Sequence, residues 1–72
     1  MQNVQRIYLM DKKIMEERLR QLSAIDRNAF DIYTRLAGLA QTQKMKASLL
    51  ALAADEKMHS KAEEEILRLI LA

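Results

Sequence analysis

Residues 44–71 read KMKASLLALAADEKMHSKAEEEILRLIL and contain neither proline nor glycine. On a helical wheel at about 100° per residue, the apolar side chains of this stretch fall on one face: Met45, Leu49, Leu52, Ala53, Ile66, Leu67 and Ile70. Charged side chains such as Lys57, Lys61 and Arg68 fall on the opposite flank. An apolar face backed by a charged one is typical of an amphipathic helix. The spacing therefore predicts a helix over residues 44–71.

The preceding part of the chain repeats this spacing. Apolar residues step by three and four positions through residues 15–40, and the one glycine among them costs only about 1 kcal/mol relative to alanine. Asp11 is placed to cap such a helix, because its carboxylate can accept a backbone N–H of the first turn. We predict a first helix over residues 12–40, an N-terminal extension over residues 1–11, and a short turn over residues 41–43.

The composition leaves an all-α fold as the only class with support. The chain has 72 residues, of which 50% are hydrophobic and 31% charged, with no proline and no cysteine. An all-β fold needs turn residues and β-branched runs that this sequence lacks. The absence of cysteine excludes disulfides, thiolate zinc sites and cysteine nucleophiles. We therefore predict a single domain, residues 1–72, built as an antiparallel helical hairpin.

The charges predict neither a nucleic-acid partner nor a membrane. The net charge is +2, and basic residues such as Lys12 and Lys13 alternate with Asp11 and Glu16, as on a solvated helix face. A nucleic-acid surface would concentrate basic residues between polar or aromatic readers. No apolar run approaches the roughly 18 residues of a membrane span. The sequence therefore predicts a soluble, cytoplasmic protein.

A lone hairpin of this length leaves its apolar stripes half exposed to water. A second copy of the same chain, packed antiparallel, would cover both stripes in a four-helix bundle. The expected partner is therefore the chain itself, as a homodimer or a higher oligomer. This self-association follows from the apolar pattern before any chemistry is considered.

Polar residues interrupt the apolar face of the second predicted helix at Glu56, His59 and Glu63, and Asp26 interrupts that of the first. Glu56 and His59 are three apart and project side by side. A Glu-x-x-His pair suits a divalent metal held between carboxylate oxygen and imidazole nitrogen. Asp26 and His59 lie equally far from position 42.5, the middle of the polar stretch of residues 41–44 about which the hairpin is expected to fold. The hairpin therefore places Asp26, Glu56 and His59 at one level, where burial is costly unless they pair or bind a cation.

Each of these residues also has a purely structural interpretation. Asp26 completes a capping box with Ser23, and His59 and Tyr33 suit ordinary core positions. Glu63 lies beyond the cluster and is placed to pair with a lysine of another helix. On this alternative, the chain is a metal-free helical self-association module. The polar cluster is then a vestigial site, neutralised by salt bridges or by protonation.

The segment from Asp26 to Ile70 resembles one half of a rubrerythrin-like, ferritin-like domain. In that family, the first helix carries an acidic ligand followed by a tyrosine, as in Asp26 and Tyr33, and the second carries Glu-x-x-His, as in Glu56 to His59. Family members bind two irons in a four-helix bundle and use them to oxidise iron or to reduce oxygen and peroxide. A single helix pair per chain is similar to the encapsulated ferritins, in which two short chains complete the diiron site.

The resemblance implies a homodimer that holds two iron ions, or manganese ions, through Asp26, Glu56 and His59 of each chain. No catalytic residue beyond the metal ligands is implied. Tyr33 and Glu63 are expected to hold the ligands in position without binding the metal themselves. The implied reaction is Fe(II) oxidation with oxygen or peroxide, serving iron storage or peroxide detoxification. One departure is that the first ligand of the family is usually glutamate, whereas Asp26 is one methylene shorter.

Overall fold

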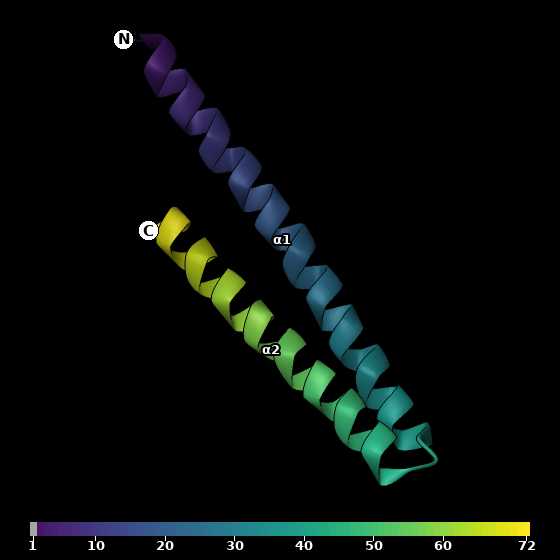
Figure 1. Cartoon of the computed structure of the whole chain (residues 1–72). Helices are drawn as coiled ribbons and strands as arrows, with labels where there is room; N and C mark the ends of the chain where they lie inside the picture. Colours follow the sequence, from purple (N-terminus) through teal and green to yellow (C-terminus); the bar gives the residue numbers. More distant parts are fainter. Residues whose placement is uncertain (1) are drawn as a thin grey trace.

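The computed structural model describes the backbone of residues 2–72 and the side chains of residues 11–72. Two helices make up this part of the chain: α1 spans Gln2–Leu39 and α2 spans Gln43–Leu71. They pack against each other in opposite directions and form a hairpin with extents of 61 × 15 × 14 Å (Figure 1). The predicted all-α hairpin is thus confirmed, and the described residues contain no strand.

The start of the first helix differs from the prediction. α1 begins at Gln2 instead of residue 12, so Asp11 lies inside the helix and does not cap it. Residues 2–10 contain no glycine or proline. An aspartate alone does not set the start of a helix when the residues before it can also adopt the helical conformation. Because α1 is longer than expected, its N-terminal part runs past the end of α2 (Figure 1). The other helix ends lie within one residue of the predicted ones.

The turn between the helices is short, and Thr42 sets its geometry. This residue is the N-cap of α2, with an extended backbone at φ −129° and ψ 154°, and its Oγ1 accepts the backbone N–H of Met45 at 3.1 Å. On the other side of the turn, the Ala40 N–H donates to the Ala37 carbonyl at 3.3 Å. Each bond satisfies a backbone group that a helix end leaves free.

Replacing Thr42 with alanine is expected to lower the free energy of unfolding by about 1 kcal/mol, because the capping bond to Met45 is lost. Thermal unfolding measures this as a fall in melting temperature of about 4–8 °C. Thr34→Ala is the matched control, since the Thr34 hydroxyl donates to the Phe30 carbonyl of its own helix at 2.8 Å and caps nothing. A loss of equal size in the control would contradict the capping role.

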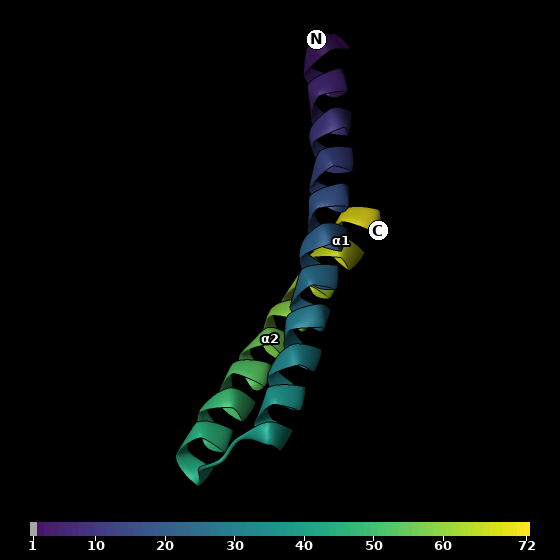
Figure 2. The same cartoon turned by 90° about the vertical axis from the view of Figure 1, so that its right-hand side faces the viewer.

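The helices meet along a seam whose residues repeat in steps of three and four, and all of which are buried or half-buried. The seam residues of α1 are Glu16, Leu19, Ser23, Asp26, Phe30, Tyr33 and Ala37, and those of α2 are Leu49, Ala53, Glu56, Ser60, Glu63, Leu67 and Ile70. This heptad repeat is that of a two-stranded coiled coil, here antiparallel. Accordingly, α2 passes from one side of α1 to the other along its length (Figure 2).

The seam encloses little apolar volume, because its most buried members are small. Ser23, Ala37 and Ala53 are only 2–3% exposed, and side chains of this size let the two helix backbones approach closely. Among the large apolar side chains of residues 11–72, Leu67 alone is buried. The hairpin by itself therefore has a thin core for its length.

Large apolar side chains gather on one side of the seam. They recur every seven residues on each helix. On α1 they are in register with the residue just before Ser23, and on α2 with the residue just before Ser60. In an antiparallel coiled coil these flanking positions of both helices share one side, and Met15 and Ile66 accordingly line the same cleft. We call this surface the apolar flank; it comprises Met15, Leu22, Ala29, Leu36, Met45, Leu52 and Ile66, with His59 at its centre. Its six large side chains are 43–51% exposed.

The opposite side of the seam is mainly polar. At the equivalent positions it carries Arg20, Arg27, Thr34, Lys57 and Glu64, with Leu50 and Leu71 as the apolar exceptions. The exposed apolar surface is thus concentrated on one side of the hairpin. Within residues 2–72, neither helix has an apolar window long enough to cross a bilayer.

Candidate metal centre

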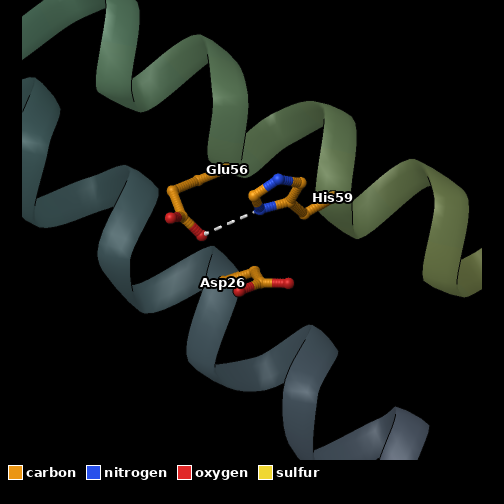
Figure 3. A group of neighbouring side chains, drawn as sticks. All are labelled: Asp26, Glu56 and His59. Carbon is orange, nitrogen blue, oxygen red and sulfur yellow. Dashed lines mark ion pairs between the residues drawn. The ribbon is translucent and has the colours of Figure 1, made fainter.

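Asp26, Glu56 and His59 converge at the middle of the hairpin. Asp26 comes from α1, Glu56 and His59 come from α2, and one ligand atom of each lies within 4.8 Å of the other two. Figure 3 shows the three side chains grouped between the two helices. The structure thus brings together the three residues that the sequence places at one level of the hairpin.

Two of these residues lie in the seam and the third lies beside it. Asp26 and Glu56 come from opposite helices of the seam and are half-buried. His59 belongs to the apolar flank, its side chain is 63% exposed, and its Nδ1 lies 3.9 Å from Oε2 of Glu56. Helix packing therefore fixes the two carboxylates, whereas the imidazole remains accessible from the open side of the hairpin.

The acidic groups around the cluster crowd one another. The pKa of Glu56 is raised because its protonated form can hydrogen-bond to Asp26, with smaller contributions from desolvation and from the charges of Asp26 and Asp55; the His59 charge opposes the shift. The pKa of Glu63 is raised to about 7, first by desolvation and then by Asp26. A cation bound among these groups would favour their ionised forms and relieve the same repulsion.

Glu63 lies one helical turn beyond His59, and part of its carboxylate has no partner. Its Oε2 is buried and makes no hydrogen bond, and none of the ion pairs among residues 11–72 includes Glu63. The pairing with a lysine that the sequence suggests is therefore not formed within the hairpin. A buried acceptor without a donor is costly, and more so when it carries charge.

The metal-free protein is expected to be more stable in mild acid than at neutral pH. The folded chain holds protons on Glu56 and Glu63 more tightly than the unfolded chain, so stability is greatest near the ordinary carboxyl pKa. It falls as the pH rises and the raised pKa values, about 7 for Glu63, are passed. In buffer containing a chelator, the melting temperature should be about 5 °C higher at pH 5.5 than at pH 8.

The matched variants for this pH dependence are Glu63→Gln and Glu64→Gln. Glu63→Gln removes the carboxyl group whose pKa is raised to about 7 and should flatten the profile, because an amide carries no charge to desolvate. Glu64→Gln alters an exposed neighbour on the polar side and should leave the profile unchanged. A parent protein that melts at a higher temperature at pH 8 than at pH 5.5 would contradict the prediction.

A buried serine pair next to the cluster is a feature that the sequence interpretation missed. Oγ of Ser23 lies 3.5 Å from Oγ of Ser60 across the seam, and Arg27 donates to Ser23 Oγ at 3.4 Å. The capping box of Ser23 with Asp26 does not form, because both residues lie within α1. The available signal was the heptad spacing of Ser60 between Ala53 and Leu67, which marks Ser60 as a seam residue.

Tyr33 lies in the seam but away from the cluster. It is two helical turns from Asp26 towards the turn, a rise of about 10 Å along the helix, and it is half-buried. Among the described side chains, its hydroxyl makes no hydrogen bond to Asp26, Glu56 or His59. Within one chain, no hydrogen bond therefore joins Tyr33 to the candidate ligands, and its expected supporting role stays a prediction.

The donor set fits a divalent transition metal. Two carboxylates and one imidazole are ligands that iron, manganese and zinc accept, and helical bundles use the Glu-x-x-His pair in this way. No family model matches the chain, and neither a curated protein nor a solved structure matches it. These comparisons therefore identify no family for the chain, and the resemblance to ferritin-like proteins stays a prediction from the sequence.

Proposed function

We propose that this chain binds a divalent transition metal, Fe(II) in the cell, through Asp26, Glu56 and His59. The observation that carries the proposal is the convergence of three ligand atoms, from both helices, within 4.8 Å of one another. The raised pKa of Glu56 supports it, because crowded carboxylates are the groups that a cation stabilises. A reducing cytoplasm, which keeps iron as Fe(II), is the compartment in which we place this activity.

We further propose that two copies pack through their apolar flanks into a ferritin-like four-helix bundle. The flank places six large apolar side chains, each 43–51% exposed, on one side of the hairpin. His59 lies at its centre, so a two-fold axis through the middle of the flank would bring the clusters of both chains together. The pair of sites would then hold two iron ions, or two manganese ions, between the chains.

The proposed reaction is the oxidation of Fe(II), which is the substrate. A pair of Fe(II) ions gives up two electrons, and hydrogen peroxide takes them together with two protons to form water; dioxygen is the other oxidant. The chain favours oxidation to Fe(III), because the negative charges of Asp26 and Glu56 stabilise Fe(III) more than Fe(II). Iron storage and peroxide detoxification are the roles that this reaction serves.

The alternative function is a metal-free helical self-association module with a vestigial site. The shift of the Glu63 pKa to about 7 favours it, because protonation can neutralise the crowded carboxylates without a cation. The apolar flank is needed on either proposal. The two functions therefore differ in metal chemistry and not in assembly.

Aerobic addition of Fe(II) distinguishes the two functions. The parent protein is expected to form ferric iron at least tenfold faster than His59→Ala, because the variant lacks the nitrogen ligand while both carboxylates remain. Ferric absorbance at neutral pH measures the rates. Lys57→Ala, on the polar side of α2, is the control and should oxidise iron as the parent does. Equal rates for the parent and His59→Ala would favour the metal-free module.

A further inference from the structure

Charged residues border the apolar flank, and they have one sign on each helix. Residues three positions after a flank residue, or directly before one, lie along the outer edge of the flank. Where the two helices lie side by side, the charged residues at these positions are two cations of α1 and two anions of α2: Arg18, Arg35, Asp55 and Glu65. We call these four residues the edge charges. Asp11 and Lys44 hold such positions only at the two ends of the hairpin, next to where the neighbouring helix stops.

The hairpin leaves the edge charges without strong partners of its own. All four are exposed, and among the described side chains neither Arg35 nor Asp55 takes part in an ion pair. Arg18 donates a hydrogen bond to the uncharged Gln21. Glu65 pairs with Arg68 of its own helix, but both side chains are more than half exposed, and such a pair contributes little. The edge charges are therefore available to another molecule.

The first cation of α1 lies at the level of an anion of α2. Asp26 and His59 meet across the seam and so mark one level of the hairpin. Arg18 lies eight residues from Asp26, and Glu65 lies six residues from His59, both on the side away from the turn. At 1.5 Å per residue, Arg18 and Glu65 differ in level by about 3 Å.

The second cation has an anion near its level as well. Arg35 lies nine residues from Asp26 and Asp55 four from His59, both towards the turn, a difference of about 7.5 Å. Helical side chains lean towards the N-terminus of their helix, which brings Arg35 and Asp55 closer because α1 and α2 run in opposite directions. Within one hairpin the flank separates the two outer edges, so these charges can meet only between copies.

We propose that two copies pack flank to flank with α1 of each copy beside α2 of the other, about a two-fold axis that runs along the helices. This inference rests on the proposed assembly through the apolar flank. Arg18 then faces Glu65 of the partner subunit, and Arg35 faces Asp55 of the partner subunit. Every helix has antiparallel neighbours, and the turns of both copies lie at the same end of the bundle.

The other face-to-face arrangement places α1 beside α1 and α2 beside α2, about an axis across the helices. Arg18 of one copy and Arg35 of the other would then lie within one residue of the same level, and Asp55 and Glu65 within two. Like charges placed together across an interface oppose association. The edge charges therefore select between two arrangements that the apolar flank alone leaves equal.

Cross-linking through introduced cysteines tests the arrangement, because the chain has none of its own. Ile25 and Ala62 are exposed residues of the outer edge and differ in level by about 3 Å by the same count. A mixture of Ile25→Cys and Ala62→Cys proteins should form covalent dimers with a short bis-maleimide, whereas Ile25→Cys alone should not. In the other arrangement, Ile25→Cys alone would cross-link, because the two copies of residue 25 would lie side by side.

Charge reversal provides an independent measurement of the same interface. Arg18→Glu should weaken self-association about fivefold, and the double variant Arg18→Glu/Glu65→Arg should restore it. Lys61→Glu makes the same change of charge on the face of α2 opposite the flank and is the control. In the other arrangement Arg18→Glu would strengthen association, because it would face Arg35 of the partner subunit.

The outcomes separate this proposal from the proposed assembly. If the parent is dimeric but Ile25→Cys cross-links alone, or neither combination cross-links, the flank interface stands and the axis along the helices is wrong. If Arg18→Glu associates as tightly as the parent or more tightly, the pairing of α1 with α2 is likewise wrong. A monomeric parent would overturn both proposals.

Discussion

Addition of Mn(II) or Fe(II) at pH 7, under anaerobic conditions for Fe(II), is expected to raise the melting temperature of the parent and to leave that of Glu56→Ala unchanged. The metal binds the assembled cluster of the folded chain and not the unfolded chain, so it stabilises folding by mass action. At a free metal concentration about 100 times the dissociation constant, the gain is about 2.7 kcal/mol per site. For a chain of this size that corresponds to a rise of about 10–20 °C.

The metal-free proteins provide a second readout of the same variant. Glu56→Ala removes one of the carboxylates that crowd Asp26, so without metal it should melt no lower than the parent. Glu64→Ala, an exposed neighbour of the site, is the control and should keep the full metal-dependent rise. A parent whose melting temperature does not respond to either metal would leave the self-association module as the function.

The second large effect is expected from a charge placed on the apolar flank. Leu52→Lys should convert an associating protein into a monomer, because the interface would have to bury an unpaired ammonium group. The parent should show no stable 8.3 kDa species at micromolar concentration. Sedimentation or light scattering measures the mass of both.

Leu50→Lys is a closely matched control for this substitution. Leu50 and Leu52 lie two residues apart on α2 and are 45% and 43% exposed, but Leu50 lies on the polar side of the seam. Leu50→Lys should therefore associate as the parent does. Equal dissociation of the two variants would show that the apolar flank is not the interface, and a folded monomeric parent would exclude the proposed dimer.

The grouping of Asp26 with Glu56 and His59 could be predicted because helix geometry leaves few choices. Once residues 41–43 are recognised as the turn, the rise per residue fixes which positions lie at one level. The start of α1 could not be predicted in the same way. An aspartate such as Asp11 can cap a helix, but it sets the start of the helix only where the preceding residues do not favour helix. Residues 2–10 do favour helix and belong to α1.

The seam itself was beyond what a single helical wheel predicts. A wheel at about 100° per residue describes one straight helix, whereas two helices that wrap around each other share a 3.5-residue repeat. Ser23 and Ser60 are polar, so neither contributes to an apolar stripe, yet both are buried in the seam. The lack of a hydrogen-bond partner for Oε2 of Glu63 could not be predicted from a helical wheel either, because it depends on which donors α1 places near that oxygen.

We expect the short turn capped by Thr42 to set the order in which the hairpin forms. Contacts next to the turn close the smallest loops and so form at the lowest entropic cost, and pairing then proceeds outward along the seam. In this order, Asp26 is expected to meet Glu56 after residues 27–55 have folded onto each other. A cation that binds the cluster stabilises contacts made late in folding, so it slows unfolding more than it accelerates folding. Metal would then govern the lifetime of the folded hairpin and leave the rate of its formation nearly unchanged.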